Sequence, residues 1–356
     1  MFFIGDKQVG GDGSCMIVFE AGPTHSGFES AKKLIELSAD AGADAVKFQI
    51  IDPDRLVADK TLPFTYEVLA DRQTGRRESV TEPLYDILSR RVLTAAEFRR
   101  LKSIADNLGL VFFATVLFDE DIDLAVSLGF ESIKIASADV NHFPFIRKAA
   151  RSGISLQLDT GNATLGEIER AVDVIRQEGN ENVIIHHCPS GYPARLDGIN
   201  LNMIVTLRQM FSHPIGFSDH SPGWEMDIAA LVLGTKLVEK TITTDRTTPS
   251  IEHIMSLEPS EMRTFVQTVR DVERALGNRR RAMAEAELEK RKSIRRSAFA
   301  KRAIAAGQLI SDDDVEFRRP GFGITPDVFE EYFAKGKATR PIEAGEMLQP
   351  GDLTAG

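Results

Sequence analysis

Ser218, Asp219 and His220 are neighbours in the stretch IGFSDHSPGW, residues 215–224. These residue types build catalytic triads, metal sites and phosphate-binding loops, and they also occur in ordinary polar turns. Adjacent residues of an extended chain point to opposite faces, so Asp219 cannot orient His220 while Ser218 attacks a substrate. Ser218 and His220 can face one side together. The spacing therefore favours an anion-binding hydroxyl beside a metal-binding imidazole over a nucleophilic triad.

Further polar side chains stand at or near the ends of short apolar runs. Three of them are lysines, Lys47, Lys134 and Lys240. One charged residue in a buried run is explained by an ion pair in the core, whereas several at successive run ends indicate a polar substrate site. The hydroxyl, amide and carboxyl groups that accompany the lysines belong to Glu20, Gln49, Thr115, Ser137, Ser190, Tyr192 and Glu239.

Lysines combined with hydroxyl groups are suited to a phosphate or carboxylate ligand, because they supply positive charge and short O–H donors. Lys134 and Ser137, three residues apart, are the strongest such pair, and Thr115, Ser190 and Ser218 extend the set. Aspartate and glutamate side chains among them would serve acid–base chemistry or metal binding. We therefore expect a small ligand that carries phosphate or carboxylate.

The elements that must position these residues alternate along the chain between residues 15 and 277. Amphipathic helix patterns at 29–42, 94–109 and 164–179 end at glycine, a usual helix C-cap. The apolar runs are continuous rather than alternating, which is typical of strands buried on both faces in a parallel sheet. The sequence thus predicts a TIM (β/α)8 barrel, whose active site lies at the carboxyl ends of its strands. The eight expected strands are 15–20, 45–50, 110–115, 132–137, 154–159, 182–187, 214–219 and 235–240.

Three segments depart from the barrel pattern. Residues 51–93 are too long for a simple connection and predict an insertion over the barrel mouth. The basic stretch 279–296 is typical of a solvated linker helix. Residues 297–356 contain two similar segments, AIAAGQLISDDDV and PIEAGEMLQPGDL, which predict a compact short-strand domain of two related halves. We expect a catalytic domain over 1–278, a linker over 279–296 and a small domain over 297–356.

Composition excludes several classes of protein. The 356 residues carry a formal net charge of -10, which argues against nucleic acid as a partner. Cys15 and Cys188 are the only cysteines; they are too few for a disulfide framework and are expected to be buried in a reducing compartment. Neither a basic leader nor an apolar run of about 20 residues is present. We expect a cytoplasmic protein without a membrane partner.

Eight motifs follow one another along the chain: EAGPTHSG, AGADAVKFQ, KIASAD, DTGN, HHCPSGYP, IGFSDHSPG, LVEKTIT and RRPGFG. In this order and spacing the sequence resembles the sialic acid synthase family over essentially its whole length. The C-terminal segment is similar to the antifreeze-like (SAF) domain of these enzymes. The resemblance implies condensation of phosphoenolpyruvate with N-acetylmannosamine or a related acylamino hexose, giving a nonulosonic acid and phosphate. It also implies a divalent metal, Mn²⁺ or Mg²⁺, and a domain-swapped homodimer.

The same resemblance implies roles for individual residues. Glu20, Lys47, Glu239 and Tyr192 are the catalytic candidates, and His220 matches a metal-binding histidine. In the implied mechanism, C3 of phosphoenolpyruvate attacks the open-chain aldehyde of the sugar, which the metal polarises, and water adds at C2 before phosphate leaves. The lysines act only as charges. The residues implied in substrate binding are Gln49, Thr115, Lys134, Ser137, Ser190 and Ser218, together with Arg319, which would reach the sugar site of the partner subunit.

Three positions depart from the family pattern. Ser26 stands where these enzymes usually carry an acid–base glutamate, Asp159 replaces a serine, and Thr241 replaces the second metal-binding histidine. A carboxylate disfavours phosphate nearby, and threonine is a poor substitute for imidazole. The sequence therefore leaves two hypotheses: a synthase of the neuraminate, legionaminate or pseudaminate type, or a carbohydrate- or phosphosugar-binding homologue with impaired catalysis.

Overall fold

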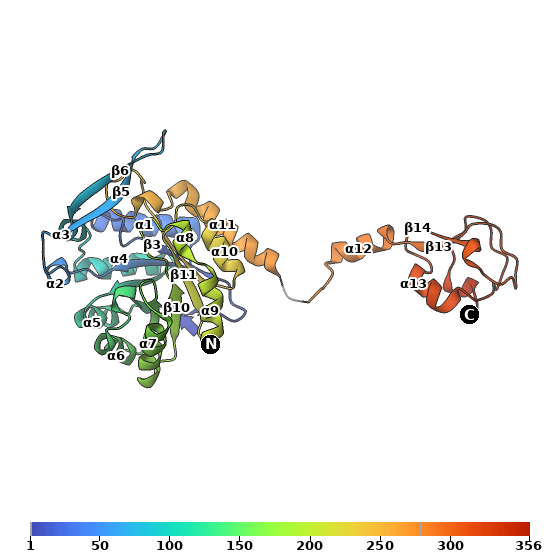
Figure 1. Ribbon diagram of the computed structural model, residues 1–356, viewed down its shortest axis with the longest axis horizontal. Helices are drawn as coiled ribbons and strands as arrows, with labels where there is room; N and C mark the ends of the chain where they lie inside the picture. Colours follow the sequence, from blue (N-terminus) through green and yellow to red (C-terminus); the bar gives the residue numbers. More distant parts are fainter. Residues whose placement is uncertain (1, 278–279) are drawn as a thin grey trace. The chain divides into compact units, whose positions relative to one another are not determined.

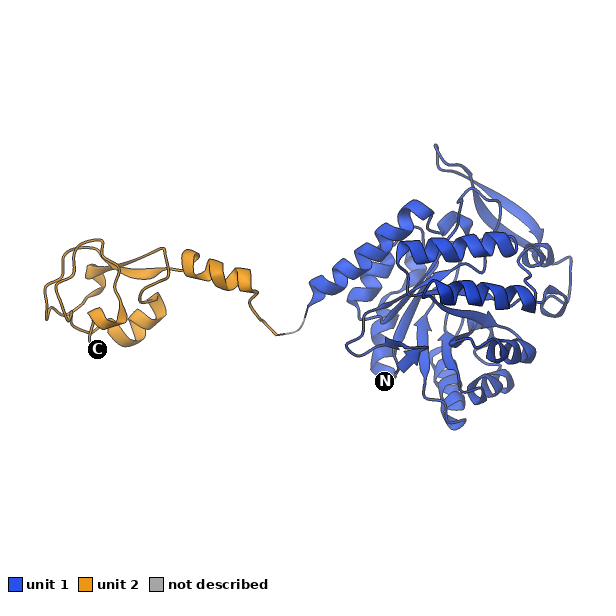
Figure 2. Cartoon of the chain, turned by 180° about the vertical axis from the view of Figure 1, so that it is seen from behind, with its two compact units in different colours: residues 1–277 blue, residues 278–356 orange. Residues whose placement is uncertain are grey.

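Eight parallel strands close into a barrel in the first of two units of the computed structural model (Figure 1). The structure describes residues 2–277 and 280–356, and the units are Met1–Gly277 and Asn278–Gly356 (Figure 2). Around the barrel the strands follow their order in the chain, and the last pairs with the first. The strands are β3 Met16–Glu20, β4 Ala45–Gln49, β7 Val111–Val116, β8 Ser132–Ile135, β9 Ser155–Asp159, β10 Val183–His187, β11 Ile215–Asp219 and β12 Leu237–Thr241. The predicted TIM barrel is confirmed.

Helices surround the barrel, and local signals set their ends. The side-chain oxygen of Thr94 accepts a hydrogen bond from the backbone N–H of Glu97, and Thr164 does the same for Glu167. Such capping boxes satisfy amides that would otherwise lack partners at a helix start. Helix α1 ends at Gly42 in the left-handed conformation. The barrel helices are α1 Phe28–Ala41, α4 Ala95–Asn107, α5 Asp119–Ser127, α6 Phe143–Arg151, α7 Leu165–Gln177, α8 Leu196–Ile199, α9 Asn202–Met210, α10 Glu225–Val232 and α11 Pro259–Leu276.

The barrel interior changes from apolar to polar along the strands. Near the amino ends of the strands, an apolar cluster of buried residues fills the inside, whereas the inward-facing residues farther along are charged or polar. The apolar cluster comprises Ile4, Val9, Met16, Val18, Ala45, Val111, Phe113, Ile184 and Leu237. Alternate strand residues, such as Ile17 and Phe217, face the helices and belong to the large outer core. The polar interior is thereby placed at the carboxyl ends.

A short hairpin that the sequence analysis did not predict precedes the barrel. Its strands are β1 Phe2–Ile4 and β2 Lys7–Val9, paired antiparallel. Ile4 and Val9 pack into the inner apolar cluster. The backbone of Phe3 exchanges two hydrogen bonds with the side chain of Asn182, just before β10. The hairpin therefore closes the amino end of the barrel.

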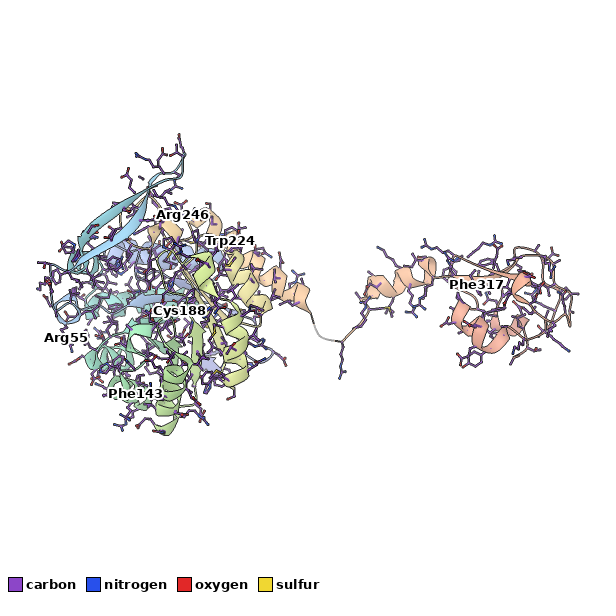
Figure 3. The ribbon with its side chains drawn as sticks, viewed as in Figure 1. Arg55, Phe143, Cys188, Trp224, Arg246 and Phe317 are labelled. Atoms are coloured by element: carbon purple, nitrogen blue, oxygen red, sulfur yellow. The ribbon has the colours of Figure 1, made fainter. Side chains whose placement is uncertain are left out.

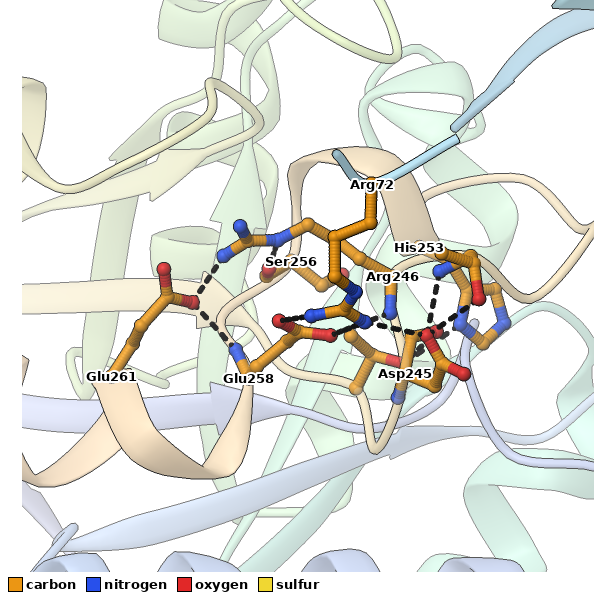
Figure 4. A network of polar contacts seen from close by, with 9 residues as sticks. Arg72, Asp245, Arg246, His253, Ser256, Glu258 and Glu261 are labelled. Carbon is orange, nitrogen blue, oxygen red and sulfur yellow. Dashed lines mark hydrogen bonds and ion pairs between the residues drawn. The ribbon is translucent and has the colours of Figure 1, made fainter. Parts of the chain in front are cut away.

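The insertion after β4 contains two short helices and a second hairpin. These elements are α2 Pro53–Leu56, β5 Pro63–Asp71, β6 Arg76–Pro83 and α3 Leu84–Ser89. Arg72, in the turn of this hairpin, donates hydrogen bonds to Glu258 at 2.6 Å and to Asp245 at 2.8 Å (Figure 4). Both acceptors follow β12, so the insertion reaches the loops at the barrel mouth, as expected. Tyr66 also donates a hydrogen bond to Glu82 at 2.6 Å, which joins the two strands of the hairpin.

The second unit consists of two halves built in the same way. In the first half Arg302 donates to Asp314 at 2.7 Å, and in the second Arg340 donates to Asp352 at 2.8 Å. Ile304 and Ile342, at equivalent positions, form a bridge between the halves. The two related halves predicted from the sequence are confirmed. The regular elements are α12 Glu285–Ile294, β13 Ser297–Ala300, β14 Val315–Arg318 and α13 Pro326–Val328.

Several smaller expectations can be compared with the structure. Helix α12 begins at Glu285, later than the linker helix expected from residue 279, and Asn278 and Arg279 lie outside the described residues. Cys15 and Cys188 are both buried, as expected, and Cys188 lies inside the barrel unit (Figure 3). None of the described helices is long and apolar enough to cross a membrane.

Candidate functional site

Two lysines and three carboxylates form a buried cluster inside the barrel at the carboxyl ends of its strands. Lys47 on β4 lies 2.5 Å from Glu20 on β3 and 2.7 Å from Glu239 on β12. Lys134 on β8 lies 2.8 Å from the other oxygen of Glu239 and 3.1 Å from Asp159 on β9. Glu239 thus bridges the two ammonium groups. We call these five residues the inner cluster.

Ser218 on β11 connects the inner cluster to an imidazole. Its hydroxyl accepts a hydrogen bond from Lys134 at 2.8 Å and lies 3.1 Å from Asp159 and 3.0 Å from Nδ1 of His186. His186 Nε2 lies 2.9 Å from the amide oxygen of Gln157. Ser218 is therefore held by a cation on one side and by two hydrogen-bond acceptors on the other.

Gly216 makes room for that imidazole. A Cβ atom at position 216 would lie 2.8 Å from the ring of His186, closer than side-chain atoms pack. The glycine faces the barrel interior two residues before Ser218, where any larger side chain would displace the ring. The expected strand 182–187 contains His186, but the sequence predicts no role for this residue. A single inward-facing glycine on the next strand does not indicate which side chain will occupy the space beside it.

Burial and neighbouring charges set the ionisation of the inner cluster. Burial opposes the charge on Glu239, yet Lys134 and Lys47 hold its pKa well below the usual range. Burial likewise opposes the charge on Lys47, but Glu20 and Glu239 raise its pKa well above the usual range. Burial raises the pKa of Glu20. Burial and the charge of Lys134 lower the pKa of His186 to about 3, so this imidazole is neutral.

Two of the predicted hydroxyls meet beside a glycine. A Cβ atom at Gly161 would lie 3.3 Å from Oγ of Ser190 and 3.4 Å from Oγ of Ser137. The hydroxyl of Ser190 donates to the carbonyl oxygen of Gly161 at 3.1 Å and to Asn162 at 2.9 Å. The loops after β8, β9 and β10 therefore bring Ser137 and Ser190 together around the DTGN motif.

Gln49 and Thr115 lie on the adjacent strands. The strand register pairs Gln49 with Thr115 and Thr115 with Lys134. Thr115 is buried and Gln49 is half-buried. The structure thus places both predicted residues on the same level of the barrel as Lys134, next to the inner cluster.

The stretch IGFSDHSPGW is divided between two faces of β11. Ser218 faces the barrel interior, whereas Asp219 faces outward and forms an ion pair with Lys240, as the alternation of strand residues requires. Lys240 also lies 3.8 Å from Asp227 on α10. Asp219, Asp227 and Lys240 are here called the outer cluster. The expectation that Lys240 belongs to the substrate site is wrong, because Lys240 and Glu239 point to opposite faces of β12.

His220 and Tyr192 lie at the rim of the mouth. Nδ1 of His220 lies 3.2 Å from the carbonyl oxygen of Pro189, and its ring centroid is 4.7 Å from that of Tyr192. Tyr192 is 43% exposed. It lines a cavity of about 1070 Å³ between the β5–β6 hairpin and the loops after β10 and β11. Tyr192 is therefore a rim residue, and no hydrogen bond joins it to the inner cluster among the described residues.

The residues present do not complete a metal centre. His220 has the orientation of a ligand, since a histidine that donates one N–H to a backbone carbonyl leaves the other nitrogen free. At the expected second position, the hydroxyl of Thr241 donates to Glu252 at 3.4 Å. No group of three histidine, cysteine or acidic side chains close enough to share a metal occurs among the described residues. Binding of Mn²⁺ or Mg²⁺ stays a prediction.

Arg319 belongs to the second unit. It is exposed and precedes Pro320 at a cis peptide bond. The expected contribution of Arg319 to a substrate site stays a prediction.

The sequence analysis missed one buried carboxylate near the mouth. Glu252, in the segment between β12 and α11, is 8% exposed and has a positive φ of 74°. Such a backbone conformation is costly for a residue with a side chain. Burial raises the pKa of Glu252 to about 7. No motif marks this residue, because it lies in a long irregular segment whose course the sequence does not predict.

The barrel and the inner cluster define the class of protein. A parallel eight-stranded barrel that gathers lysines, carboxylates and hydroxyls at the carboxyl ends of its strands is a TIM-barrel protein with a polar ligand site at its mouth. The chain belongs to the NeuB family, whose model matches residues 34–281. Residues 295–354 match the SAF domain.

Relatives of known name cover most of the chain. It is 34% identical to the N,N'-diacetyllegionaminic acid synthase of Legionella pneumophila over 90% of each chain. It is 29% identical to the human N-acetylneuraminate-9-phosphate synthase over 86% of this chain and 84% of the human one. A crystal structure of the N-acetylneuraminic acid synthetase from Leptospira borgpetersenii in complex with citrate is 29% identical, with a TM-score of 0.71. It covers 81% of this chain and 94% of that one.

Proposed function

We propose that the protein is a phosphoenolpyruvate-dependent nonulosonic acid synthase that condenses phosphoenolpyruvate with an N-acylamino hexose such as N-acetylmannosamine. The observation that carries the proposal is the array Lys47–Glu239–Lys134–Ser218, in which two ammonium groups and a hydroxyl are fixed at the barrel mouth. Membership of the NeuB family supports it, because relatives of this chain include synthases of legionaminic and neuraminic acid derivatives.

In this proposal, Lys47, Lys134 and Ser218 hold the charged groups of phosphoenolpyruvate. Ser137 and Ser190, which meet at Gly161, bind its phosphate or carboxylate oxygens from the other side. Gln49 and Thr115 complete this half of the site. Because Glu239 stays ionised between the lysines, it fixes their positions and does not exchange protons.

The reaction forms one carbon–carbon bond and releases one phosphate. C3 of phosphoenolpyruvate attacks the aldehyde carbon of the open-chain sugar, and the aldehyde oxygen takes up a proton. Water adds to C2, loses a proton, and the C2–O bond to phosphate breaks. Burial raises the pKa of Glu20, which makes this residue the candidate for proton transfer within the inner cluster. Tyr192 at the rim contacts the sugar, and no covalent enzyme intermediate is required.

The test is phosphate release from phosphoenolpyruvate with a panel of acylamino hexoses, in the presence and absence of Mn²⁺. Turnover that depends on one sugar supports the proposal. Absence of turnover with every sugar, in a protein that still binds phosphoenolpyruvate, contradicts it. The dependence on Mn²⁺ tests whether His220 acts as a metal ligand.

We also propose that Arg319 completes the sugar site across a domain-swapped homodimer. The proposal is supported by the matched SAF domain, which contains Arg319. Mixed dimers of Arg319→Ala and Lys134→Ala subunits should then recover activity that neither variant shows alone. Mixed dimers without recovery would contradict a shared site.

A carbohydrate- or phosphosugar-binding protein with impaired catalysis is the second candidate. The observation that favours it is the contact of 3.1 Å between Lys134 and Asp159, since this carboxylate competes with phosphate for the ammonium group. The Asp159→Ser variant distinguishes the two functions. If Asp159 impairs catalysis, this variant should release phosphate faster than the unmodified protein.

A further inference from the structure

A second polar cavity, separate from the inner cluster, lies between the loops after β3 and β12 and the end of the insertion. Its volume is about 330 Å³, and none of the residues that line it is acidic. Two arginines and two histidines line it, and most of the other side chains are hydroxyls. The hydroxyl residues are Thr24, Ser26, Ser30, Thr244, Thr248 and Ser250. We call this space the Arg91 cavity.

Arg91 places a buried positive charge on the wall of this cavity. The residue is 4% exposed and forms no ion pair with any described residue within 4.0 Å. Among the described residues, its guanidinium donates to the hydroxyl of Ser250 at 3.3 Å and to the carbonyl oxygen of Ile251 at 3.5 Å, and to no carboxylate. Burial lowers its pKa, and the charge of Glu252 opposes this effect without forming an ion pair with Arg91 within 4.0 Å. Buried charges are normally paired, because removal from water is otherwise costly.

The neighbouring residue, Arg90, is paired with a carboxylate. Arg90 lines the same cavity, and its guanidinium donates to both oxygens of Glu82, at 2.9 Å and 2.6 Å. This is the two-pronged geometry in which arginine binds carboxylate or phosphate groups. Arg91, one residue later, lacks such an anion.

His25 adds a buried hydrogen-bond donor without an acceptor. It lines the cavity and is 4% exposed. Its Nδ1 accepts a hydrogen bond from the backbone N–H of Gly27 at 3.3 Å, so in the neutral ring Nε2 carries the proton. Burial and Arg91 lower its pKa to about 4, which keeps the ring neutral. Nε2 has no partner among the described residues, and an unpaired buried donor is unfavourable.

We propose that the Arg91 cavity binds an oxyanion of the phosphate type, with Arg91 as the charged donor, His25 Nε2 as a neutral donor and the serine and threonine hydroxyls around them. An anion of this kind would pair the guanidinium and satisfy the imidazole at once. The proposal rests on the cavity alone, so it holds or fails independently of the synthase reaction. Such a group is supplied either by free inorganic phosphate or by a phosphate carried on a sugar.

Calorimetric titration of the full chain tests the site and distinguishes the two sources. The probes are inorganic phosphate, N-acetylmannosamine 6-phosphate and N-acetylmannosamine. All titrations use the Lys134→Met background, in which the inner cluster has lost one cation. Binding of inorganic phosphate indicates a site for the free ion, and binding of the sugar phosphate alone indicates a phosphorylated substrate. Failure of both anions to bind overturns the proposal.

Two further variants locate the site. Arg91→Met should weaken anion binding at least tenfold, whereas Arg90→Met, whose guanidinium is already paired, should weaken it less than threefold. Equal weakening by the two variants would indicate a general cationic surface and overturn the proposal. If Arg91→Met does not fold, His25→Leu replaces it, since loss of the Nε2 donor should also weaken binding while circular dichroism stays unchanged. Unchanged binding in a folded His25→Leu or Arg91→Met variant contradicts the assignment.

Discussion

The inner cluster lies inside the barrel, and the outer cluster lies on the opposite face of the barrel sheet, at β11 and β12. Ser218 and Glu239 face into the barrel, and their immediate neighbours Asp219 and Lys240 face the helices. Both clusters combine lysine with carboxylates, and both are buried. They differ in what completes them. The hydroxyl of Ser218 contacts the inner cluster, which lies at the mouth end of the barrel. Helix α10 covers the outer cluster.

Protonation sets the balance of charge in the outer cluster. Burial and the charge of Asp219 raise the pKa of Asp227 well above the usual range. Burial opposes the charge on Asp219, but Lys240 holds its pKa below the usual range. One carboxylate, one ammonium and one neutral acid therefore balance without a ligand. The inner cluster contains three carboxylates and two ammonium groups, with one carboxylate, Asp159, partly accessible at 14% side-chain exposure. Residue types alone do not distinguish a structural cluster from a ligand site. The face of the strand on which the residues lie distinguishes the two.

Loss of the outer cation should have the largest effect on stability. Lys240→Met leaves Asp219 and Asp227 buried without a cation, and we expect the free energy of unfolding to fall by about 3–5 kcal/mol. Urea unfolding followed by circular dichroism measures it. In the control Lys134→Met, Glu239 keeps Lys47 at 2.7 Å, so the loss should be smaller. Equal losses would show that the inner cluster is also chiefly structural.

Loss of the inner cation should act on catalysis. We expect Lys134→Met to lower kcat/KM for phosphate release by about 10²–10³, the range for removal of one preorganised charge or donor. The matched control is Lys236→Met, because Lys236 is a half-buried lysine just before β12, far from the carboxyl ends of the strands, whose ammonium group donates to the carbonyl oxygen of Gly11. A similar decrease in both variants would remove the functional distinction between the two ends of the barrel.

Glu252 belongs to neither cluster and should impose a pH dependence on stability. Its pKa rises from 4.5 to about 7 on folding, so the folded state binds the proton more tightly. Stability should therefore fall as pH rises through this window, by at most about 1.4 kcal/mol per pH unit. Glu252→Gln should lack this component. Denaturant unfolding of both proteins from pH 4 to 8 measures the difference, and parallel curves would contradict it.

Gly216 offers the mildest perturbation of the inner face. Gly216→Ala forces the ring of His186 away and should cost about 1–3 kcal/mol of stability, as overpacking does. Because His186 contacts Ser218, kcat/KM should fall too, by roughly tenfold. Gly198→Ala is the control, since no atom lies within 4 Å of a Cβ built there. A Gly216→Ala variant with unchanged activity would show that the orientation of His186 does not matter.

The fold could be predicted from the sequence to a large extent. Continuous apolar runs predict all eight strands, and the terminal glycines mark where three of the helices end. The β1–β2 hairpin was missed because its strands are three residues each, too short for a periodic pattern. Strand alternation separated Ser218 from Asp219 correctly. The same alternation places Glu239 and Lys240 on opposite faces of β12.

The candidate site was predictable only where a side chain ends a strand. Glu20, Lys47, Lys134, Ser218 and Glu239 come together because parallel strands end at one level of the barrel. Arg91 and Glu252 lie outside the barrel strands, and neither belongs to a motif. Their positions depend on how the insertion and the segment after β12 pack, which no local pattern specifies.

The N-terminal hairpin has a kinetic consequence. Ile4 and Val9 close the apolar end of the barrel, so the mouth is the entrance to the polar interior. Ligands that enter through the mouth must also leave through it. Two substrates and two products would then share a single passage. The ligand seated deepest, against Lys47 and Lys134, arrives first and departs last. A closed amino end therefore imposes an order of binding and release on the proposed condensation.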